Sequence, residues 1–559
     1  MISAFARNDY NSMAIQLFEV MMMREGAIPD RITFIHALSG CISHVNLVTG
    51  KKMHVYIIYR NLDSDIITST SLISMYDRCG SLTDAREVFH RMPIRNVVTW
   101  NALISGYAQH GYGKNALVCF ECMKHEGISP QPISFVCALK ACASIRACDK
   151  GRTIHLEIIE RDFLGGNVLV STTLVDMYAK CGELSSAKRV FNALYFHDVA
   201  TWNALIAGYV DHGQSKEALD CYTQMRCKGL LPDPVTFVCI LKACGSIGEV
   251  EKGHELHDEI VRQGLHIENA SIGNALVDMY AKCGEFSKAQ DVLDNLPAKD
   301  SIAWNAIITS YVRHGHDEEA LDCFHKMQRQ CLLLPDAVTY ISILKACGHV
   351  GATCKGQEIH DEITREGLLD KSFLLSTALV DMYAKCGALL EAQEIFDEHP
   401  VKDVVSWNVL MAGYAQLGKH DIIFHSLDKM IVEGVPPDTA TFTIILNACS
   451  HSGLLEKGQI YFETMNSKYG LVPTLEHHTC MVGLFGRAGH FNGAEIIING
   501  IPFLTDLAVW HTVLSACKKW GNVGLGKLAF GCATQLDVDH AASYVYMGDI
   551  YAADGGMED

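Results

Sequence analysis

Apolar residues recur along this chain at the spacing expected for helices that are buried on one side. Between residues 199 and 233, Trp202, Leu205, Ile206 and Tyr209 stand at positions i, i+3, i+4 and i+7. This spacing places four side chains on one face of an amphipathic helix. The pattern therefore predicts a helix with a buried stripe at the start of this segment.

A second helix is predicted in the same segment. His212 and Gly213 interrupt the first stripe, and Ala218, Tyr222 and Met225 form another. A glycine shortly after the last periodic residue marks the end of this helix too. We expect an antiparallel pair of helices whose apolar stripes pack against neighbouring pairs.

The same phrase returns along the whole chain. Trp100, Trp202, Trp304 and Trp407 each stand before an asparagine and an apolar run, and they lie 102, 102 and 103 residues apart. Each interval divides into three repeats of about 35, 36 and 31 residues, each too small to bury a core of its own. We therefore predict an all-α fold, a solenoid superhelix of stacked antiparallel helix pairs over residues 1–506.

Composition narrows the class of protein. The 559 residues include 13 prolines, and no linker-like or low-complexity stretch separates the repeats. No uninterrupted apolar run approaches the roughly 18 residues of a membrane span, so we expect a soluble protein without a membrane partner. The formal net charge of −18 at pH 7 opposes a nucleic-acid-binding role, which usually begins with a basic domain.

The cysteines follow the repeat. The chain contains 22 of them, and eight recur at two fixed positions: Cys142, Cys244, Cys347 and Cys449 at one, and Cys79, Cys181, Cys283 and Cys386 at the other. Recurrence at a fixed phase indicates small buried packing residues in a reducing compartment, not a disulfide framework.

The chain begins inside a repeat. Residues 1–6 align with residues 103–108, so the first repeat is truncated and we expect the natural chain or its gene model to extend upstream. No targeting peptide can be identified, and this is no evidence for a cytosolic protein.

One face of the first helices carries candidate contacts for a ligand. If the apolar stripe is buried, the second, fifth, ninth and thirteenth residues of each first helix lie on another face, which lines the concave groove. In the 31-residue repeats the thirteenth residue is a cation each time: Arg78, Lys180, Lys282, Lys385 and Arg487. We predict that this row contacts phosphate. The alternative is a row of solvated side chains.

The repeated phrases resemble a known family. Trp202-Asn-Ala-Leu-Ile-Ala-Gly-Tyr209, Leu174-Val-Asp-Met-Tyr-Ala-Lys-Cys-Gly182 and Leu241-Lys-Ala-Cys244 are similar to pentatricopeptide-repeat proteins of the PLS class, in which standard, long and short repeats alternate. The resemblance implies a right-handed, tetratricopeptide-like superhelix, although the residue pattern itself leaves the hand open. Residues 507–540 resemble the first extension motif of such arrays, and residues 541–559 resemble an incomplete second one, with no DYW deaminase domain.

The resemblance also implies that each repeat reads one base of single-stranded RNA. The fifth and last residues of a repeat face the base, and apolar second residues such as Val98, Ala200 and Ile302 sandwich it. Short amide, hydroxyl and carboxylate groups suit hydrogen bonding to base edges. Family usage assigns Thr70 with Asn96 to A; Thr172 with Asp198, Thr377 with Asp403 and Thr479 with Asp506 to G; and Asn203 with Asp233, Asn274 with Asp300, Asn305 with Asp336 and Asn408 with Asp438 to U.

Some repeats receive no base. The pair of Asn101 with Gln131 departs from the family's pairs, and the fifth residues of the long repeats offer few polar groups: Ile35, Val136, Val238, Ile341 and Thr443. The predicted RNA is A-N-N-G-U-N-U-U-N-G-U-N-G, with its 5′ base at the N-terminal end. The alternative role for a single Asn or Asp at the end of a repeat is to cap the following helix.

Three motifs imitate catalytic or nucleotide-binding signatures. His155-Leu-Glu157, His257-Asp-Glu259 and His360-Asp-Glu362 match half of a zinc-deaminase signature but recur in the long repeats without its cysteines. Cys119-Phe-Glu-Cys122 is a lone Cys-x-x-Cys that helix packing explains. The segment from Gly521 to Lys527 lacks the Ser/Thr of a phosphate-binding loop and lies between helices. We expect no metal, no cofactor and no enzyme activity.

Two classes of function remain. The leading hypothesis is a protein of the mitochondrion or chloroplast that binds single-stranded RNA and directs C-to-U editing or related processing. Another chain or a lost C-terminal segment would supply the deaminase. A deaminase-bearing protein or editing accessory factors would bind the C-terminal extension. The alternative is a tetratricopeptide-like scaffold for protein–protein interaction, which suits the acidic charge. A basic groove favours RNA, and an acidic or apolar groove favours protein.

Overall fold

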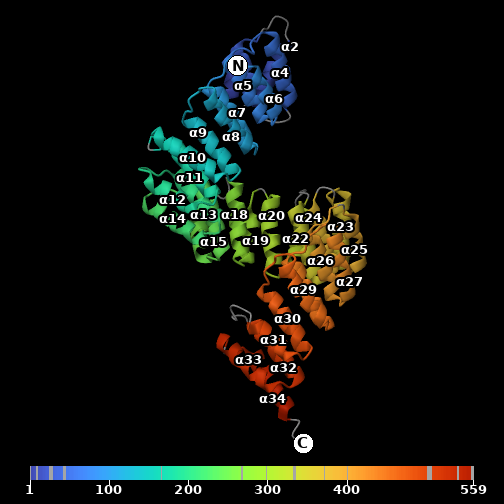
Figure 1. The fold of residues 1–559 in the computed structure, drawn as a ribbon. Helices are drawn as coiled ribbons and strands as arrows, with labels where there is room; N and C mark the ends of the chain where they lie inside the picture. The colour runs from blue at the N-terminus through green and yellow to red at the C-terminus, as the bar shows by residue number, and fades with distance from the viewer. Residues whose placement is uncertain are drawn as a thin grey trace. The chain divides into compact units, whose positions relative to one another are not determined.

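The computed structural model describes residues 2–7, 11–23, 29–41, 46–164, 166–265, 269–297, 299–330, 335–369, 372–399, 401–499, 507–537 and 540–555. Over these ranges the chain forms α-helices joined by short turns, with no strand (Figure 1). No helix in the described ranges is long and apolar enough to cross a membrane. The predicted all-α fold is confirmed.

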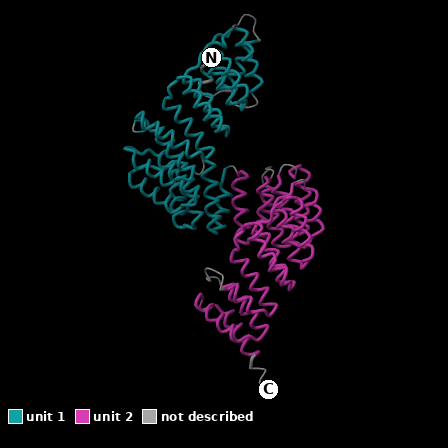
Figure 2. Tube along the Cα trace, viewed as in Figure 1, with its two compact units in different colours: residues 1–297 teal, residues 298–559 magenta. Residues whose placement is uncertain are grey.

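The helices form two compact units, residues 1–297 and 298–559 (Figure 2). The division falls inside the predicted array. We describe each compact unit by itself. The predicted boundary between array and extension follows residues 500–506, which lie outside the described residues.

The described ranges of the first compact unit contain nine helix pairs. The first helices are α1 (Ile2–Arg7), α3 (Arg31–Ser39), α5 (Ile66–Arg78), α7 (Val97–Gln109), α9 (Pro132–Ser144), α11 (Val168–Lys180), α13 (Val199–Asp211), α15 (Pro234–Ile247) and α18 (Ala270–Lys282). Their partners are α2 (Asn11–Met23), α4 (Leu47–Tyr59), α6 (Leu82–Arg91), α8 (Gly113–His125), α10 (Cys148–Glu160), α12 (Leu184–Ala193), α14 (Ser215–Cys227), α16 (Val250–Arg262) and α19 (Phe286–Asn295).

The second compact unit continues the same order. Its first helices are α20 (Ser301–Arg313), α22 (Ala337–Val350), α24 (Phe373–Lys385), α26 (Val404–Gln416), α28 (Thr439–Ser452), α30 (Leu475–Arg487), α32 (Leu507–Trp520) and α34 (Ala541–Gly555). Their partners are α21 (Asp317–Gln330), α23 (Thr353–Arg365), α25 (Leu389–Glu398), α27 (His420–Val432), α29 (Leu455–Ser467), α31 (Phe491–Asn499) and α33 (Val523–Leu536).

Within each compact unit, first helices pack against their own partners and against the first helices of neighbouring repeats, as α11 does with α12, α9 and α13. The predicted stripe of α13 is buried, because its four apolar side chains are at most 4% exposed. The ring of Trp202 meets the ring of Phe191, from the preceding repeat, edge-on at 4.5 Å. Aromatic contacts of this kind stabilise the packing of successive repeats beyond the contribution of the apolar area that they bury.

Glycines end the helices as the sequence predicts. Gly213 and Gly229 adopt φ values of +73° and +77°, the left-handed conformation that a residue with a Cβ rarely takes. These two residues turn the chain from α13 into α14 and from α14 toward the next repeat.

The recurring cysteines are packing residues. Cys142, Cys244, Cys347 and Cys449 are fully buried, which confirms their predicted role. Burial raises the pKa of the Cys142 thiol to about 12, so it stays protonated. At the other recurring position Cys79 is buried, while Cys181, Cys283 and Cys386 are half-buried.

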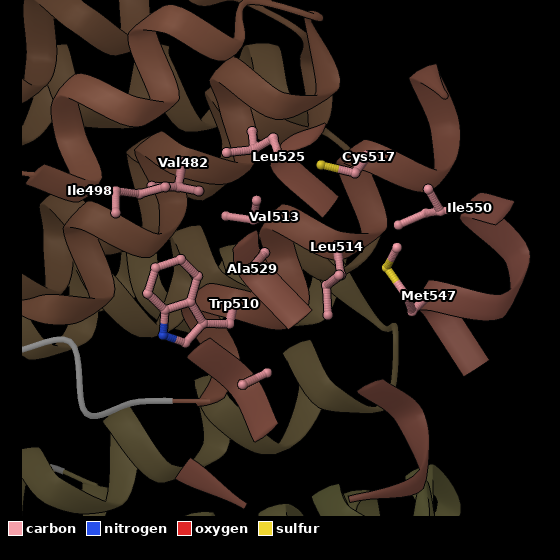
Figure 3. Packing of buried hydrophobic residues seen from close by; sticks show 11 residues of the cluster. Val482, Ile498, Trp510, Val513, Leu514, Cys517, Leu525, Ala529, Met547 and Ile550 are labelled. Carbon is pink, nitrogen blue, oxygen red and sulfur yellow. The ribbon is translucent and has the colours of Figure 1, made fainter. Parts of the chain in front are cut away.

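The C-terminal helices share one core with the end of the array. Val482 and Ile498 of the last array repeat pack in a buried cluster with Trp510 and Val513 of α32 and with Ile550 of α34 (Figure 3). This cluster fixes α30, α32 and α34 against one another, so the extension continues the same stack.

Candidate nucleic-acid interface

The register of the repeats matches the sequence prediction. From α3 onward, each first helix begins at the predicted first position, and the last residue of one repeat precedes the first helix of the next. Asp198 and Asp233 occupy this last position, and their carboxylates accept a hydrogen bond from the backbone N–H three residues later. These residues therefore cap helices, the alternative role considered for them. We call the surface formed by the last residues and by the second, fifth, ninth and thirteenth residues of the first helices the reader face.

The fifth and last residues of three repeats are hydrogen-bonded to each other. Asn203 Nδ2 donates to Asp233 Oδ1 at 2.9 Å. Thr236, the third residue of the next repeat, shares its one hydroxyl hydrogen between Asn203 Oδ1 at 2.6 Å and Asp233 Oδ1 at 2.8 Å. We call this arrangement the reader triad: a fifth-position Asn, the last-position Asp and the third residue of the following repeat.

Two further reader triads have the same geometry. One consists of Asn305, Asp336 and Thr339, and the other of Asn408, Asp438 and Thr441. Their Asn–Asp contacts measure 2.9–3.0 Å, and their hydroxyls donate to the Asn oxygen at 2.5 and 2.7 Å. In every triad the Asn oxygen faces a hydroxyl and its nitrogen faces a carboxylate, which fixes the orientation of the amide. In the triads of Asn203 and Asn408 one amide hydrogen serves the Asn–Asp bond, so the second can meet another acceptor.

Asp336 has protein partners at both of its carboxylate oxygens. Asn305 Nδ2 lies 3.0 Å from Asp336 Oδ1 and 2.9 Å from Asp336 Oδ2, so both carboxylate oxygens already have a donor. Asp336 Oδ1 also accepts from the backbone N–H of Thr339 at 2.9 Å and thereby caps α22. The physical reason is the junction between repeats, which brings the fifth residue, the last residue and the next helix start within hydrogen-bond distance. Asp336 can therefore meet a base only through the remaining lone pairs of its oxygens.

The carboxylate of one triad, that of Asp438, favours the ionised form. Burial alone would raise the pKa of Asp438, but hydrogen bonds from Thr441 and Asn408 outweigh it and hold that pKa below its ordinary value. Asp438 therefore presents a carboxylate that can only accept hydrogen bonds. An imino or amino N–H of a base is a suitable donor for it.

The Thr-Asp pairs are connected differently. Thr172 Oγ1 lies 2.7 Å from Thr201 Oγ1, and Thr201, again the third residue of the next repeat, donates to Asp198 Oδ1 at 2.5 Å. Because Thr201 uses its hydrogen on Asp198, Thr172 is the donor to Thr201. Thr377 instead bonds the carbonyl of Phe373, and Asp403 caps α26.

Thr70 and Asn96 line one cavity of about 290 Å³ beside α5 and the start of α7. The same cavity is lined by the apolar second residues of both repeats, Ile67 and Val98, and by Arg78. The structure thus brings together the predicted base-reading pair, the two sandwiching residues and a predicted phosphate contact.

The three remaining predicted base-reading pairs are Asn101 with Gln131, Asn274 with Asp300 and Thr479 with Asp506. Asn101 Oδ1 is buried without a hydrogen-bond partner, and Ser134 accepts from the backbone of Gln131, so this departing pair forms no triad. Asn274 belongs to the first compact unit and Asp300, which caps α20, to the second. Thr479 lines a cavity of about 530 Å³, whereas Asp506 lies outside the described residues.

Apolar second residues are exposed on the reader face. Val98 and Ile302 are 60% and 63% exposed, and Ala200 is also exposed. The larger members of this row are all more than half exposed: Ile32, Ile67, Val98, Ile133, Leu169, Val235, Ile302, Val338, Leu374 and Val405. A periodic row of uncovered apolar side chains is typical of a binding surface.

The predicted cation row is largely charge-compensated. Three lysines form ion pairs with the ninth residue of their own helix, at 2.7–2.8 Å: Lys180 with Asp176, Lys282 with Asp278 and Lys385 with Asp381. Arg78 and Arg487 donate instead to the backbone carbonyls of Ser39 and Ser450. The reader face therefore carries both positive and negative side chains. A uniformly basic groove would have favoured RNA over a protein ligand. An exposed pair of this kind is worth only about 0.3–0.5 kcal/mol, so a phosphate can replace the aspartate.

The motifs that resemble a zinc-deaminase signature and a phosphate-binding loop have structural roles in this fold. His155, His257 and His360 each bond the tyrosine hydroxyl of the next first helix, at 2.9–3.1 Å: Tyr178, Tyr280 and Tyr383. Among the described residues, no group of three His, Cys, Asp or Glu side chains could hold a metal ion. Asn522, within the loop-like segment, caps α33.

The third residue of the following repeat escaped the sequence analysis. Thr236, Thr339 and Thr441 looked like ordinary helix-start residues, because each also accepts a bond from the last residue's backbone N–H in a capping box. The signal that could have found them is a hydroxyl at that position after every Asn-Asp pair except the one at Asn274, which Ala303 follows.

Stacked helix pairs, several of which carry a pair of polar residues at the junction with the next, define a helical-repeat protein. Models of the PPR repeat family match residues 95–144, 197–246, 299–349 and 402–451, and the PPR repeat model matches residues 1–25, 67–97, 170–194, 235–265, 274–300, 376–398 and 440–469. The chain belongs to the pentatricopeptide-repeat family. This membership agrees with the expectation that it is not an enzyme.

Similar proteins come from Arabidopsis thaliana. Pentatricopeptide repeat-containing protein At4g33990 is 34% identical over 558 residues, covering 100% of this chain and 67% of that protein. Pentatricopeptide repeat-containing protein At3g53360, mitochondrial, is 34% identical and covers 100% and 72%; At1g11290, chloroplastic, is 34% identical and covers 99% and 68%. The crystal structure of PPR10 in complex with an 18-nt psaJ RNA element aligns with 98% of this chain and 84% of that one, at 18% identity and a TM-score of 0.47.

Proposed function

We propose that this chain binds single-stranded RNA sequence-specifically, one nucleotide per repeat, on the reader face. The cavity beside α5 carries the proposal most directly. It is lined by a base-reading pair, Thr70 and Asn96, by two apolar side chains, Ile67 and Val98, and by Arg78. These are the groups needed to hydrogen-bond a base edge, cover both faces of a base and hold a phosphate.

The reader triads supply the specificity. An amide held between Thr236 and Asp233 cannot turn freely, so Asn203 presents a fixed donor next to a fixed acceptor. A base with an adjacent acceptor and donor on its Watson–Crick edge, such as uracil, complements that arrangement. Guanine carries the same two adjacent groups, and family usage assigns the Asn-Asp pair to U.

The biological role that fits best is site recognition in organellar RNA. The chain would direct C-to-U editing or related processing in the mitochondrion or chloroplast, with a deaminase supplied by another chain. Two relatives carry the words mitochondrial and chloroplastic in their names, which supports an organellar setting. A deaminase-bearing protein or an editing accessory factor would meet the chain at its extension.

A selection from a random RNA pool tests the proposal. The purified chain should enrich A-N-N-G-U-N-U-U-N-G-U-N-G, read 5′ to 3′ from the N-terminal end of the array. A variant with Asn203, Asn305 and Asn408 replaced by Ala should lose enrichment at nucleotides 5, 8 and 11 only. Enrichment of no G/U pattern at these places would refute the assigned pairs.

The alternative function is a protein-binding scaffold. The ion pairs that compensate Lys180, Lys282 and Lys385 favour it, because they remove net positive charge from the reader face. If the chain binds no single-stranded RNA at low salt, the scaffold becomes the better explanation of the exposed apolar row.

A further inference from the structure

We propose that the first extension repeat, residues 507–540, holds one more nucleotide of single-stranded RNA, immediately 3′ of the bases read by the array. The site is a pocket of about 480 Å³ whose lining includes Arg487 of α30, His511 and Lys519 of α32, and Tyr546 of α34. This inference rests on the proposed function and extends it to a segment to which the resemblance assigns only protein partners.

The pocket occupies the same place in its repeat as the cavity at Thr70 does in an array repeat. Both are lined by the fifth, sixth, ninth, tenth and thirteenth residues of their central helix, which is α5 in one case and α32 in the other. Both also include the ninth residue of the preceding first helix, Ser39 or Gly483. The extension therefore continues the reader face without a change of register.

The reading positions of this repeat carry a hydrogen-bonding set of their own. His511 is the fifth residue and His540 the last, and their rings lie 4.7 Å apart. His511 Nε2 lies 2.9 Å from the hydroxyl of Ser543, the fully buried third residue of the next repeat. These are the three positions of the reader triad, with imidazole in place of the amide and the carboxylate.

Burial and the neighbouring His540 lower the pKa of His511, so its ring is neutral at pH 7. A neutral imidazole has one donor and one acceptor nitrogen, as a base edge requires. Tyr546 adds a second ring to the wall of the pocket, 5.9 Å from that of His511. Aromatic walls of this kind stack nucleobases.

The cations of the pocket are not compensated as those of the central repeats are. Lys519 and Arg487 are both thirteenth residues, and the ninth residues of their helices are Ser515 and Gly483 in place of aspartate. Within the ranges that the structure describes, neither cation has an ion pair; each donates to a backbone carbonyl instead. Two adjacent positive charges at an aromatic pocket favour the phosphate and base of a nucleotide over an acidic or apolar protein surface.

The test uses the full chain and two RNAs. One carries the 13 predicted nucleotides, and the other has a single nucleotide added at the 3′ end, supplied with each of the four bases and also as an abasic site. Fluorescence anisotropy should show tighter binding of the longer RNA by about tenfold for the best base, which is within the range for stacking one base on an aromatic side chain. His511→Ala should remove the difference between that base and the abasic site. Lys519→Ala should weaken binding of the longer RNA, abasic or not.

Lys518→Ala is the matched control. Lys518 is adjacent in sequence, carries the same charge and pairs with Asp549 at 2.7 Å, outside the lining of the pocket. It should leave the gain from the fourteenth nucleotide unchanged. Because Lys519 is exposed, its replacement by alanine also separates loss of the contact from loss of folding.

The outcomes separate this inference from the function on which it rests. If the 13-nucleotide RNA does not bind, the proposed function fails, and the inference with it. If that RNA binds but the added nucleotide gives no gain, the extension site is refuted and the array function stands. Equal losses for both RNAs in His511→Ala and Lys519→Ala would also refute the site. So would a protein partner that binds the extension while the added nucleotide has no effect.

Discussion

The hydroxyl of Thr236 should set how strongly the pair of Asn203 and Asp233 prefers uracil, although Thr236 belongs to the next repeat. The side chain is fully buried and donates to Asn203 Oδ1 at 2.6 Å. Thr236→Val keeps the shape of the side chain and removes this donor, together with the contacts of the same hydroxyl to Asp233 Oδ1 at 2.8 Å and to the Asp233 backbone N–H at 3.2 Å. The capping bond of α15 should survive, because Asp233 Oδ1 accepts from the backbone N–H of residue 236 at 2.8 Å.

The magnitude follows from the burial of the amide. Asn203 is 7% exposed, so a carbonyl oxygen without a donor there costs about 1–3 kcal/mol. We expect the amide to relieve this cost by rotating toward water, held by Asp233 alone. A good base contact is worth about 1–3 kcal/mol, so loss of its fixed geometry should reduce discrimination by about tenfold.

The assay compares RNAs with U or C at nucleotide 5, the base assigned to this repeat, by fluorescence anisotropy on the wild type, Thr236→Val and Thr236→Ser. The valine variant should lose most of its preference for U, and the serine variant should retain it, because serine keeps the hydroxyl. If the valine variant folds and still prefers U to the same degree as the wild type, the third residue does not position the reader.

Three other perturbations test separate features. Thr172→Asn turns the pair with Asp198 into an Asn-Asp pair, so the preferred nucleotide 4 should change from G to U by about tenfold or more; continued preference for G in parallel binding curves would contradict the assignment. Replacing Lys180, Lys282 and Lys385 with Ala should make the salt dependence of binding shallower by about two units of log–log slope, at about 0.7 per phosphate contact, and an unchanged slope would mean that these lysines stay with their aspartates. Burial lowers the pKa of His54, His155 and His360 in the fold, so the unfolded chain binds protons more readily and stability should fall as the pH drops below about 6.5. Thermal denaturation at pH 7.5 and 5.5 should show this loss of stability, and a variant with the three histidines replaced by Gln should lose less. An equal loss in the wild type and the variant would mean that these histidines do not cause the pH dependence.

The sequence was sufficient to predict the helices and their register. The stripe of Trp202 and Tyr209 and the glycine at 213 define α13, which begins at Val199 as the repeat pattern predicts. Local periodicity determines these features, and every repeat provides the same evidence again.

The two roles considered for the last residue were treated as alternatives in the sequence, and the structure shows that they occur together. Asp233 caps α15 and also binds Asn203. Asp336 likewise caps α22 while both of its oxygens accept from Asn305. A carboxylate has two oxygens with about four lone-pair sites, so one side chain can serve the helix start and the reader at once.

The sequence also contained the information needed to predict the ion pairs of the reader face, because Asp176 and Lys180 stand four residues apart. Opposite charges four residues apart on a helix form a pair, a rule that predicts the compensation seen in three repeats. By contrast, the bonds of Thr236 to Asn203 and of His155 to Tyr178 join different repeats, 33 and 23 residues apart. Such contacts depend on how the repeats stack, which no local pattern specifies.

The reader triad separates the functional module of this array from its structural repeat. An exchange of residues 199–233 between arrays would carry Asn203 and Asp233 but leave Thr236 behind. At a site followed by an alanine, as at Ala303, the transplanted amide would lose its hydroxyl donor. A cassette cut from 202 to 236 keeps all three members on one piece of chain. Engineered arrays built on this protein should therefore be joined after the third residue of a first helix.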